Sequence, residues 1–322
     1  MEIKNQPLSF LPYLKSVIWG GEKIKVYKGI NTDQEKIGES WEISAVPGHV
    51  SVVEEGLYKG MSLNDLIDEF GSQLLGESVT KKYGKNFPLL IKFIDAADNL
   101  SVQVHPDDQL ARKRHNSLGK TEMWYIIDAE PDAKIFSGLN REITPEEYKK
   151  RVEEGTFAET LAEHSSNPGD VFFLPAGRIH AIGAGNLLAE IQENSDVTYR
   201  IYDYDRRDAN GNPRELHTDL AKDAIDYKVY DNYKEEAPSE SEKEVTLAEC
   251  EHFVTKRLII DGNKTIVTDG HSFEILICLE GNVKIICSEG STHLNAGHSA
   301  LIPAKVKQFT LEGKAKLLST HL

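Results

Sequence analysis

One short stretch of the chain spaces glycine, proline and histidine in a way that few folds can use. From Gly169 the order is glycine, five residues, Pro175, one residue, Gly177, two residues and His180. A mostly apolar interval followed by proline and glycine is typical of a buried strand that ends in a tight turn. The pattern therefore predicts a strand–turn unit that His180 closes.

A second group of candidate ligands lies earlier in the chain. Gln103 and His105 are two residues apart, so in a strand both side chains leave the same face. Glu122 opens the next apolar run. Two imidazoles and a carboxylate, with an amide oxygen as a possible fourth ligand, suit a divalent ion such as Zn²⁺ with one position open for substrate. We expect the ligands to be His105, Glu122 and His180, with Gln103 either binding the ion directly or orienting His105.

These motifs resemble those of a known family and follow the same order. The spacing from Gly169 to His180 is similar to the second motif of the cupin superfamily, although Asn186 stands two positions later than the usual asparagine. The longer pattern resembles class I mannose-6-phosphate isomerase (phosphomannose isomerase), in its short bacterial form. The segments that carry this resemblance are 12–15, 18–21, 38–44, 101–108 with Lys120 and Glu122, 175–182 and 190–206.

The resemblance implies a mainly β fold of two cupin (jelly-roll) barrels with a few added helices. It also implies an aldose–ketose isomerase that interconverts mannose 6-phosphate and fructose 6-phosphate by metal-assisted proton transfer through an enediol. Positions that match the family make Arg200, Glu190 and Asp196 the expected catalytic residues, and the choice of base between the two carboxylates stays open. The expected substrate-binding residues are Ser101, Lys120 and Arg206.

One position departs from the family pattern. Longer members carry a histidine before the lysine that Lys120 matches, whereas this chain has Gly119. A proton relay through that histidine cannot operate here. The sequence therefore does not identify the acid or base that opens the sugar ring. The remaining histidines, His252 among them, lie in no motif and are interpreted as ordinary residues.

Two alternative functions are compatible with the metal ligands. The chain could be a cupin isomerase or epimerase of another sugar that uses iron or manganese. It could also be a non-catalytic sugar-binding cupin, which would need neither Arg200 nor the basic residues expected to hold a phosphate. The presence of both favours the enzyme.

The C-terminal part of the chain contains a degenerate repeat of the same motif. Residues 274–281 have the glutamate–glycine spacing of the first cupin motif, and 297–303 repeat the opening of 169–175. Lys305 and Gln308 stand where Gly177 and His180 stand in the first copy. We therefore expect a second barrel without metal and with a structural role.

Length and local composition predict two domains. A chain of 322 residues can build two cores. The acidic, serine-containing segment 231–244 is typical of a linker. We expect a metal-binding catalytic cupin domain with helical additions at 1–235 and a degenerate cupin domain without metal at 245–322.

Local patterns also predict individual elements. Runs at 41–44, 50–53 and 89–94 favour strands, the last of them buried. Residues 62–70 have helical spacing with Ser62 as N-cap, and Thr144, Pro145 and Glu147 form a helix start. Short helical pieces are expected at 158–163 and 219–226, and no helix is expected after 245.

Composition limits the partners. A net charge of −15 argues against nucleic acid or an anionic membrane as partner, while a few local basic residues are enough to bind a small sugar phosphate. No segment approaches 18 apolar residues and no signal-peptide pattern opens the chain, so we expect a cytoplasmic protein. The three cysteines, Cys250, Cys278 and Cys287, cannot all pair, which favours buried free thiols.

Overall fold

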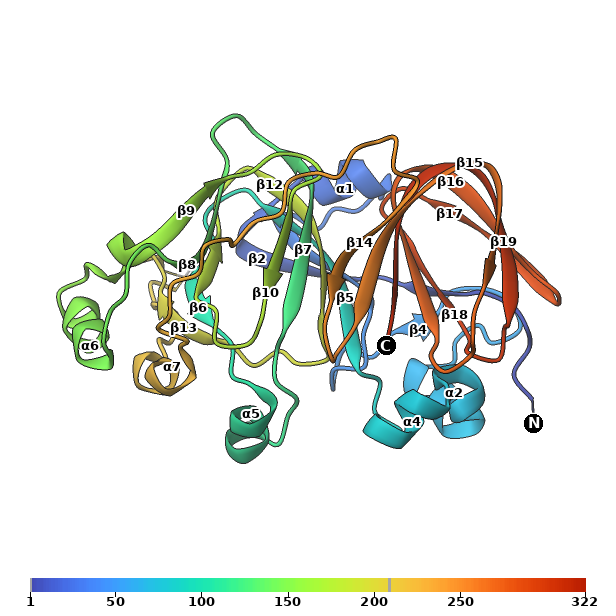
Figure 1. Ribbon diagram of the computed structural model, residues 1–322, viewed down its shortest axis with the longest axis horizontal. Helices are drawn as coiled ribbons and strands as arrows, with labels where there is room; N and C mark the ends of the chain where they lie inside the picture. Colours follow the sequence, from blue (N-terminus) through green and yellow to red (C-terminus); the bar gives the residue numbers. More distant parts are fainter. Residues whose placement is uncertain (1, 208–209) are drawn as a thin grey trace.

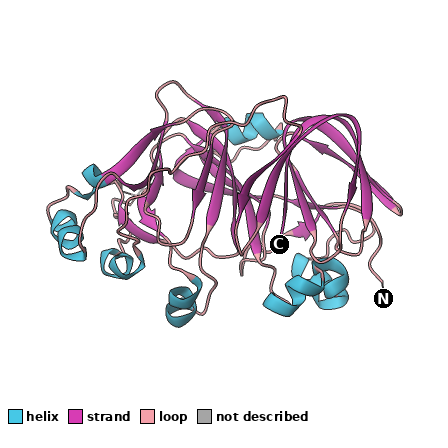
Figure 2. Cartoon of the chain, viewed as in Figure 1, coloured by secondary structure: helices cyan, strands magenta, loops and turns pink. Residues whose placement is uncertain are grey.

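The computed structural model describes residues 2–207 and 210–322. Strands make up both halves of the molecule, and the helices lie at the periphery (Figure 2). A six-stranded and a five-stranded sheet form one half, and an eight-stranded sheet forms the other (Figure 1). The prediction of a mainly β fold is confirmed, whereas the closure into two barrels stays a prediction.

The six-stranded sheet lies in the middle of the molecule, between the other two sheets. Its order is β10 (Val171–Leu174), β7 (Glu122–Ala129), β12 (Asn186–Glu193), β5 (Leu89–Ala96), β2 (Tyr13–Gly21) and β3 (Ile37–Ile43), and β3 also pairs directly with β5. Every residue of β5 and β12 is buried. Leu89, Ile91 and Phe93 share a core with Ile275 of the eight-stranded sheet, while Ile94 belongs to a separate core on the other face. Burial on both faces explains the continuous apolar run that predicted this strand.

The five-stranded sheet is built from short strands. Its order is β13 (Tyr199–Tyr202), β6 (Val102–Val104), β11 (His180–Ile182), β8 (Lys134–Leu139) and β9 (Leu161–Ser165). Because β6 lies between β13 and β11, Gln103 is opposite Arg200 on one side and opposite His180 on the other. Three predicted site residues therefore form one row across neighbouring strands.

The eight-stranded sheet combines strands from both ends of the chain. Its order is β14 (Glu244–Glu249), β15 (Val254–Val267), β19 (Gln308–His321), β16 (Glu274–Cys287), β18 (Ser299–Ile302), β1 (Leu8–Leu11) and β4 (Val52–Val53), with β17 (Gly290–Asn295) beside β16. Leu8 pairs with Leu301, and the largest hydrophobic core contains side chains from both halves. The predicted domain limits of 1–235 and 245–322 stay a prediction, and this pairing joins their two sides.

The helices confirm most of the local predictions. They are α1 (Lys23–Lys28), α2 (Leu63–Phe70), α3 (Ser72–Leu75), α4 (Glu77–Tyr83), α5 (Asp108–His115), α6 (Pro145–Glu153), the 3₁₀ helix η1 (Phe157–Thr160) and α7 (Thr218–Ala224). Ser62 caps α2 in a capping box with Asp65, and Thr144 caps α6 by accepting the N–H of Glu147. None of the helices in the described ranges is long and apolar enough to cross a membrane.

The expected helix at 158–163 is only partly correct. The 3₁₀ turn ends at Thr160, and β9 begins at Leu161. Lys134 and Phe136 of β8 pair with Ser165 and Glu163, so edge pairing with β8 outweighs the weak helical preference of the segment.

The predicted linker at 231–244 is extended and held in place. Arg257, which is buried, donates to the backbone carbonyls of Pro238, Ser239 and Glu242. Glu235 forms a backbone bridge with Val171. The segment therefore follows a defined path between the two halves despite its polar composition.

Candidate active site

The metal-ligand candidates converge at one buried point. His105 Nε2 lies 3.6 Å from Glu122 Oε2, and His180 Nε2 lies 3.3 Å from Glu122 Oε1. The three side chains are at most 2% exposed, and they come from the segment after β6, the start of β7 and the start of β11. The structure therefore brings together three residues that lie up to 75 positions apart in the sequence (180 − 105).

Backbone carbonyls orient both imidazoles toward this point. His105 Nδ1 lies 3.0 Å from the carbonyl of Val197, and His180 Nδ1 lies 2.9 Å from the carbonyl of Arg178. A carbonyl can only accept, so Nδ1 carries the proton in each ring and Nε2 presents a lone pair. This is the second-sphere arrangement that metal-binding histidines usually show.

The donor set fits a divalent ion. His105 Nε2 and Glu122 Oε1 are buried and accept no hydrogen bond among the described residues, while Glu122 Oε2 faces the ammonium of Lys120. Donors about 2.1 Å from a tetrahedral ion lie about 3.4 Å apart, close to the spacings observed here. Burial lowers the pKa of His180 to about 3 and places that of His105 well below its usual value, so both rings stay neutral as ligation requires.

Gln103 borders the same point. Its amide nitrogen lies 3.2 Å from His180 Nε2, and its amide oxygen accepts a 3.3 Å hydrogen bond from Ser101. A half-turn of the amide exchanges these two atoms and directs the oxygen toward the His105–Glu122–His180 group. Direct ligation by Gln103 stays a prediction that this position allows.

The glycine of the histidine motif has a clear structural reason. Gly177 has φ +89°, and a Cβ at this position would lie 3.0 Å from the carbonyl oxygen of Ala224 in α7. Its N–H donates to the carbonyl of His105. The turn thus needs glycine and joins the two histidine segments.

A cavity of about 340 Å³ opens next to the ligand group. It is lined by Lys15, Val17, Trp19, Glu39, Trp41, Lys92, Ile94, Leu100, Ser101, Gln103, Lys120, Ile182, Glu190, Asp196, Thr198, Arg200 and Arg214. Both sheets of this half contribute to the lining. The cavity therefore contains all the predicted catalytic residues and two of the three predicted substrate-binding residues.

Lys120 lies close to the ligand group. Its ammonium is 3.0 Å from Glu122 Oε2, and its side chain is 6% exposed. The preceding Gly119 has no room for a side chain, because a Cβ there would lie 2.5 Å from the backbone nitrogen of Asp108. A histidine cannot replace Gly119 unless the start of α5 moves, which explains the departure from the family pattern.

Glu190 is held at both oxygens. Lys92 Nζ lies 3.0 Å from Oε1, and Trp124 Nε1 donates to Oε2 over 2.8 Å. Burial opposes the charge of Glu190, but the nearby Lys92 and Lys120 hold its pKa down to about 2. Glu190 is therefore a fixed carboxylate whose lone pairs are already engaged.

Sequence reasoning missed Lys92 and its second partner, Glu39. Lys92 Nζ lies 3.7 Å from Glu39 Oε2, which also accepts a hydrogen bond from Trp41 Nε1. A single lysine in the otherwise apolar run 89–94 was the available signal, because a buried lysine requires an acidic partner.

Two arginines line the cavity, but Arg206 is not one of them. Arg200 Nε is buried without an acceptor, and its Nη1 donates to the carbonyl of Glu215. Burial and the nearby Arg214 lower the pKa of Arg200, yet a guanidinium remains charged at neutral pH.

Asp203 contacts both Arg206, which the sequence predicted as a site residue, and Arg214, which it did not. Arg206 contacts Asp203 and Asp98 and donates to the carbonyl of Asn99. Arg214 also contacts Asp203 and reaches the cavity. Arg214 is thus a candidate site residue that lies outside the family-like segments of the sequence.

Asp196 differs from Glu190 in its surroundings. It is exposed and lines the cavity. The turn that carries it is held by Gln192, whose amide donates to the carbonyls of Glu193 and Ser195. Asp196 is therefore the accessible carboxylate of the two predicted candidates.

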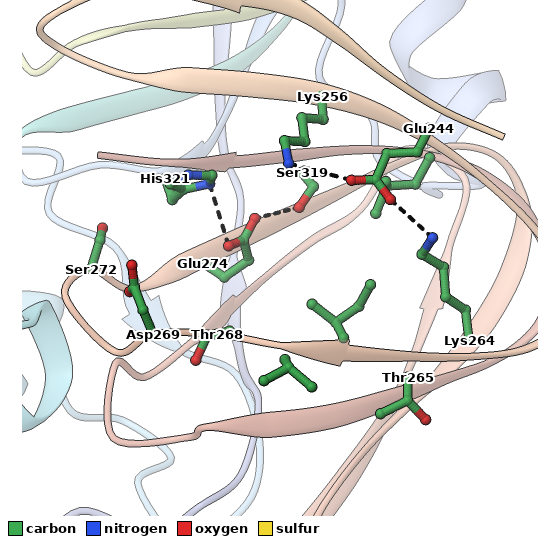
Figure 3. Close-up of a pocket in the computed structure, with 13 residues that line it drawn as sticks. Glu244, Lys256, Lys264, Thr265, Thr268, Asp269, Ser272, Glu274, Ser319 and His321 are labelled. Atoms are coloured by element: carbon green, nitrogen blue, oxygen red, sulfur yellow. Dashed lines mark hydrogen bonds and ion pairs between the residues drawn. The ribbon is translucent and has the colours of Figure 1, made fainter. Parts of the chain in front are cut away.

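A separate pocket of about 380 Å³ lies on the eight-stranded sheet (Figure 3). Lys256 and Lys264 both contact Glu244, while His321 and Ser319 contact Glu274. Its charges largely neutralise one another. None of the metal-compatible groups found among the described residues lies in this pocket.

The cysteines follow the prediction. Cys278 and Cys287 are buried, Cys250 is half-buried, and all three are free. Burial raises the pKa of both Cys278 and Cys287 to about 12, which keeps these thiols unreactive.

Comparisons with known proteins identify the family of this chain. The family model described as phosphomannose isomerase type I, catalytic domain, matches residues 8–163, and the mannose-6-phosphate isomerase cupin domain matches residues 243–322. Mannose-6-phosphate isomerase ManA of Bacillus subtilis is 38% identical over 98% of this chain and 99% of its own length. The mannose-6-phosphate isomerase of Streptococcus mutans is 33% identical over 98% of each chain.

A solved structure extends the similarity to the fold. The mannose 6-phosphate isomerase of Bacillus subtilis has a TM-score of 0.89 with 34% identity, and the match covers 98% of this chain and 99% of that one. Sequence similarity over nearly the whole length, the two family models and this fold agree on one assignment. The chain belongs to the type I phosphomannose isomerase family.

Proposed function

We propose that the chain interconverts mannose 6-phosphate and fructose 6-phosphate. The observation that carries this proposal is the buried group of His105, Glu122 and His180 beside a cavity that also contains Lys120 and Arg200. The assignment is supported by relatives that are named mannose-6-phosphate isomerase and align over nearly the whole chain.

We propose zinc as the ion held by His105, Glu122 and His180, with Gln103 at the fourth position. Two imidazoles, a carboxylate and an amide oxygen are compatible with zinc, and of these four residues Gln103 lines the cavity. When bound, the ion supplies Lewis-acid stabilisation of the oxygens at C1 and C2 without changing its redox state.

The two carboxylates have different roles in this proposal. Asp196 is the base that moves the proton between C1 and C2, because it is exposed, lines the cavity and has no hydrogen-bond or ion-pair partner among the described residues. Glu190, with its low pKa and two engaged oxygens, is a weak base. Glu190 instead holds the ammonium of Lys92 in place and contributes a permanent negative charge to the cavity wall.

The cations bind the substrate at different places. Arg200 has a buried Nε without an acceptor and stabilises the enediolate oxygens as a fixed charge. Lys120 and Ser101 bind sugar oxygens near the ligand group. Arg214 contacts the phosphate, and Arg206 supports Arg214 through Asp203.

A small sugar phosphate is therefore the proposed partner, and the cytoplasm the proposed location. Three free cysteines, two of them buried, are compatible with a reducing compartment. The basic side chains of the cavity offset locally the acidic charge of the whole chain.

Turnover of mannose 6-phosphate deuterated at C2, followed by NMR, tests the function. We expect fructose 6-phosphate to form with transfer or loss of the label, activity to disappear with a chelator and to return with added zinc. Elemental analysis of the same samples identifies the ion. Activity only on another sugar phosphate would assign the chain to a different isomerase or epimerase, and binding without turnover would make it a sugar-binding protein.

A further inference from the structure

Lys120 reaches the cavity from a short segment that belongs to no helix or strand. Residues 119–121 connect the loop after α5 to the start of β7. A lysine side chain has many rotamers, so the position of its ammonium 3.0 Å from Glu122 depends on how its backbone is held. The contacts of this segment therefore bear directly on the site.

Glu193 holds the segment by two hydrogen bonds. Its Oε2 accepts the N–H of Thr121 over 2.7 Å, and its own N–H donates to the carbonyl of Thr121 over 3.1 Å. Thr121 lies between Lys120 and Glu122, so Glu193 fixes the backbone between a cavity lysine and a candidate ligand. The carboxylate of Glu193 is 3% exposed.

A second carboxylate holds the other end of the segment. Asp108, the first residue of α5, accepts the N–H of Gly119 through Oδ1 over 2.8 Å. The absence of a side chain at Gly119 allows this close approach. Lys120 is thus flanked on both sides by backbone N–H groups bound to carboxylates.

The partner of Glu193 comes from the other half of the chain. His252 lies in the turn between β14 and β15, and its Nδ1 is 3.0 Å from Glu193 Oε1. Burial opposes a charge on His252, but the adjacent Glu193 carboxylate raises its pKa above the usual value. The raised pKa favours the protonated imidazole, whose charge is opposite to that of the buried Glu193 carboxylate.

We propose that Glu193 and His252 are positioning residues that hold segment 119–121 and thereby place the Lys120 ammonium at the cavity. The eight-stranded half of the molecule then supports the active site through His252. This inference rests on the proposed function only where Lys120 acts on the sugar phosphate. It modifies the expectation of a purely structural C-terminal half and the interpretation of His252 as an ordinary residue.

The same side chains could instead form a second cation site. One ligand atom each from Asp108, Glu193 and His252 lies within 4.8 Å of the others. His252 Nδ1 and Glu193 Oε1 form an ion pair without a hydrogen bond, and Asp108 accepts the N–H of Gly119, so both carboxylates have a partner without a cation, which favours positioning. The metal content of the variants separates the two explanations.

The first experiment measures backbone protection and needs no substrate. Hydrogen exchange is compared between the wild type, His252→Ala, His252→Gln and the matched control His293→Ala, whose histidine is exposed on β17. We expect exchange of the peptide that spans 116–123 to be about 10-fold faster in His252→Ala, because its protection depends on local opening. The control should resemble the wild type, and His252→Gln, which keeps a hydrogen-bond donor, should be intermediate.

The second experiment asks whether His252 acts through Lys120. We expect His252→Ala to lower kcat/KM for mannose 6-phosphate about 10-fold, because a small displacement of a positioned group is costly. In a Lys120→Met background the same substitution should cost less than about 2-fold, since coupled residues are not additive. Metal content should stay near one ion per chain throughout.

The outcomes separate this inference from the function on which it rests. The positioning role would be overturned if His252→Ala lowered kcat/KM equally in the wild-type and Lys120→Met backgrounds. It would also be overturned if His252→Ala left the hydrogen exchange of 116–123 unchanged. Two ions per chain in the wild type and one in His252→Ala would replace it with a cation site. A wild type that is inactive on mannose 6-phosphate would refute the proposed function, and the exchange comparison would still decide the positioning role.

Discussion

At the scale of single residues, the ligand group depends on which nitrogen of each histidine carries the proton. The carbonyls of Val197 and Arg178 hold the Nδ1 protons of His105 and His180. Nε2 of His105 therefore presents an unpartnered lone pair beside Glu122, and Nε2 of His180 faces the Gln103 amide. Burial adds to this effect by disfavouring the charged form of both rings.

The first prediction concerns these ligands. His180→Ala should lose most of the bound metal and activity, because it removes one of three closely spaced donors. The exposed His271 offers a control, and His271→Ala should keep both. The measurement is elemental analysis with kinetics on the same preparations. Full metal occupancy in a His105→Ala/His180→Ala double variant would show that the ion binds elsewhere.

The second prediction separates the arginines. Arg200→Ala should lower kcat on the order of 10²–10³-fold with a smaller change in KM, because it removes a charge that acts mainly in the transition state. Arg214→Ala should mainly raise KM for the phosphorylated sugar. Arg206→Ala should raise KM less, because its guanidinium supports Asp203 and does not line the cavity.

Steady-state kinetics with mannose 6-phosphate and mannose, together with metal analysis, test this series. All three variants should keep their metal, because an arginine does not ligate a cation. A wild-type kcat in Arg200→Ala would remove its catalytic role. A larger KM effect in Arg206→Ala than in Arg214→Ala would return the direct phosphate contact to Arg206.

At the scale of the elements, strand register assembles the cavity wall. Lys92 of β5 is paired with Glu190 of β12 and with Trp41 of β3, and Glu190 is paired with Trp124 of β7. Four neighbouring strands thus place one row of polar and aromatic groups on the same face. A shift of one residue in any of these strands would turn its member of the row away.

The third prediction tests this row. Lys92→Met should lower the free energy of unfolding by about 3–5 kcal/mol, because it leaves two buried carboxylates, Glu39 and Glu190, without their cation. Lys92→Met combined with Glu39→Gln should recover part of the loss. Chemical denaturation monitored by circular dichroism measures both. A loss below about 1 kcal/mol in the single variant would mean that the network contributes little to stability.

At the scale of the whole molecule, the two halves share structure. β1 from the N-terminal end pairs with β18, and one hydrophobic core contains Leu8, Phe93 and Phe273. His252 adds a polar contact with Glu193 across the same boundary. Because β pairing and a common core are both cooperative, we expect the halves to fold as one unit rather than as separable domains.

The fourth prediction concerns the degenerate motif. Gln308 opens β19, is exposed and does not line the cavity beside His105, Glu122 and His180. Gln308→Ala should leave metal content, kcat and KM within about 2-fold of the wild type and shift stability by about 0.5 kcal/mol or less. Kinetics and thermal unfolding provide the measurement. Loss of metal or of most of kcat would show that the second motif retains a function.

Some of this protein follows from its sequence alone. Local patterns of a few residues specify the geometry of strands, turns and helix caps. Examples are the spacing from Gly169 to His180, the pair Gln103 and His105, and the caps Ser62 and Thr144. The family resemblance added roles for Arg200, Glu190 and Asp196, and the structure places all three at one cavity.

The remaining features depended on the tertiary structure. Three of these features are contacts between distant segments: Lys92 with Glu39, His252 with Glu193, and β1 with β18. A fourth is the position of Arg214, which contacts Asp203 and lines the cavity, whereas Arg206 does not line it. Periodicity specifies which face of a strand is buried, but it does not specify which strand lies opposite or in which register. The candidate ligands could therefore be named from the sequence, whereas the groups that line the cavity around them were decided by how the sheets pair and pack.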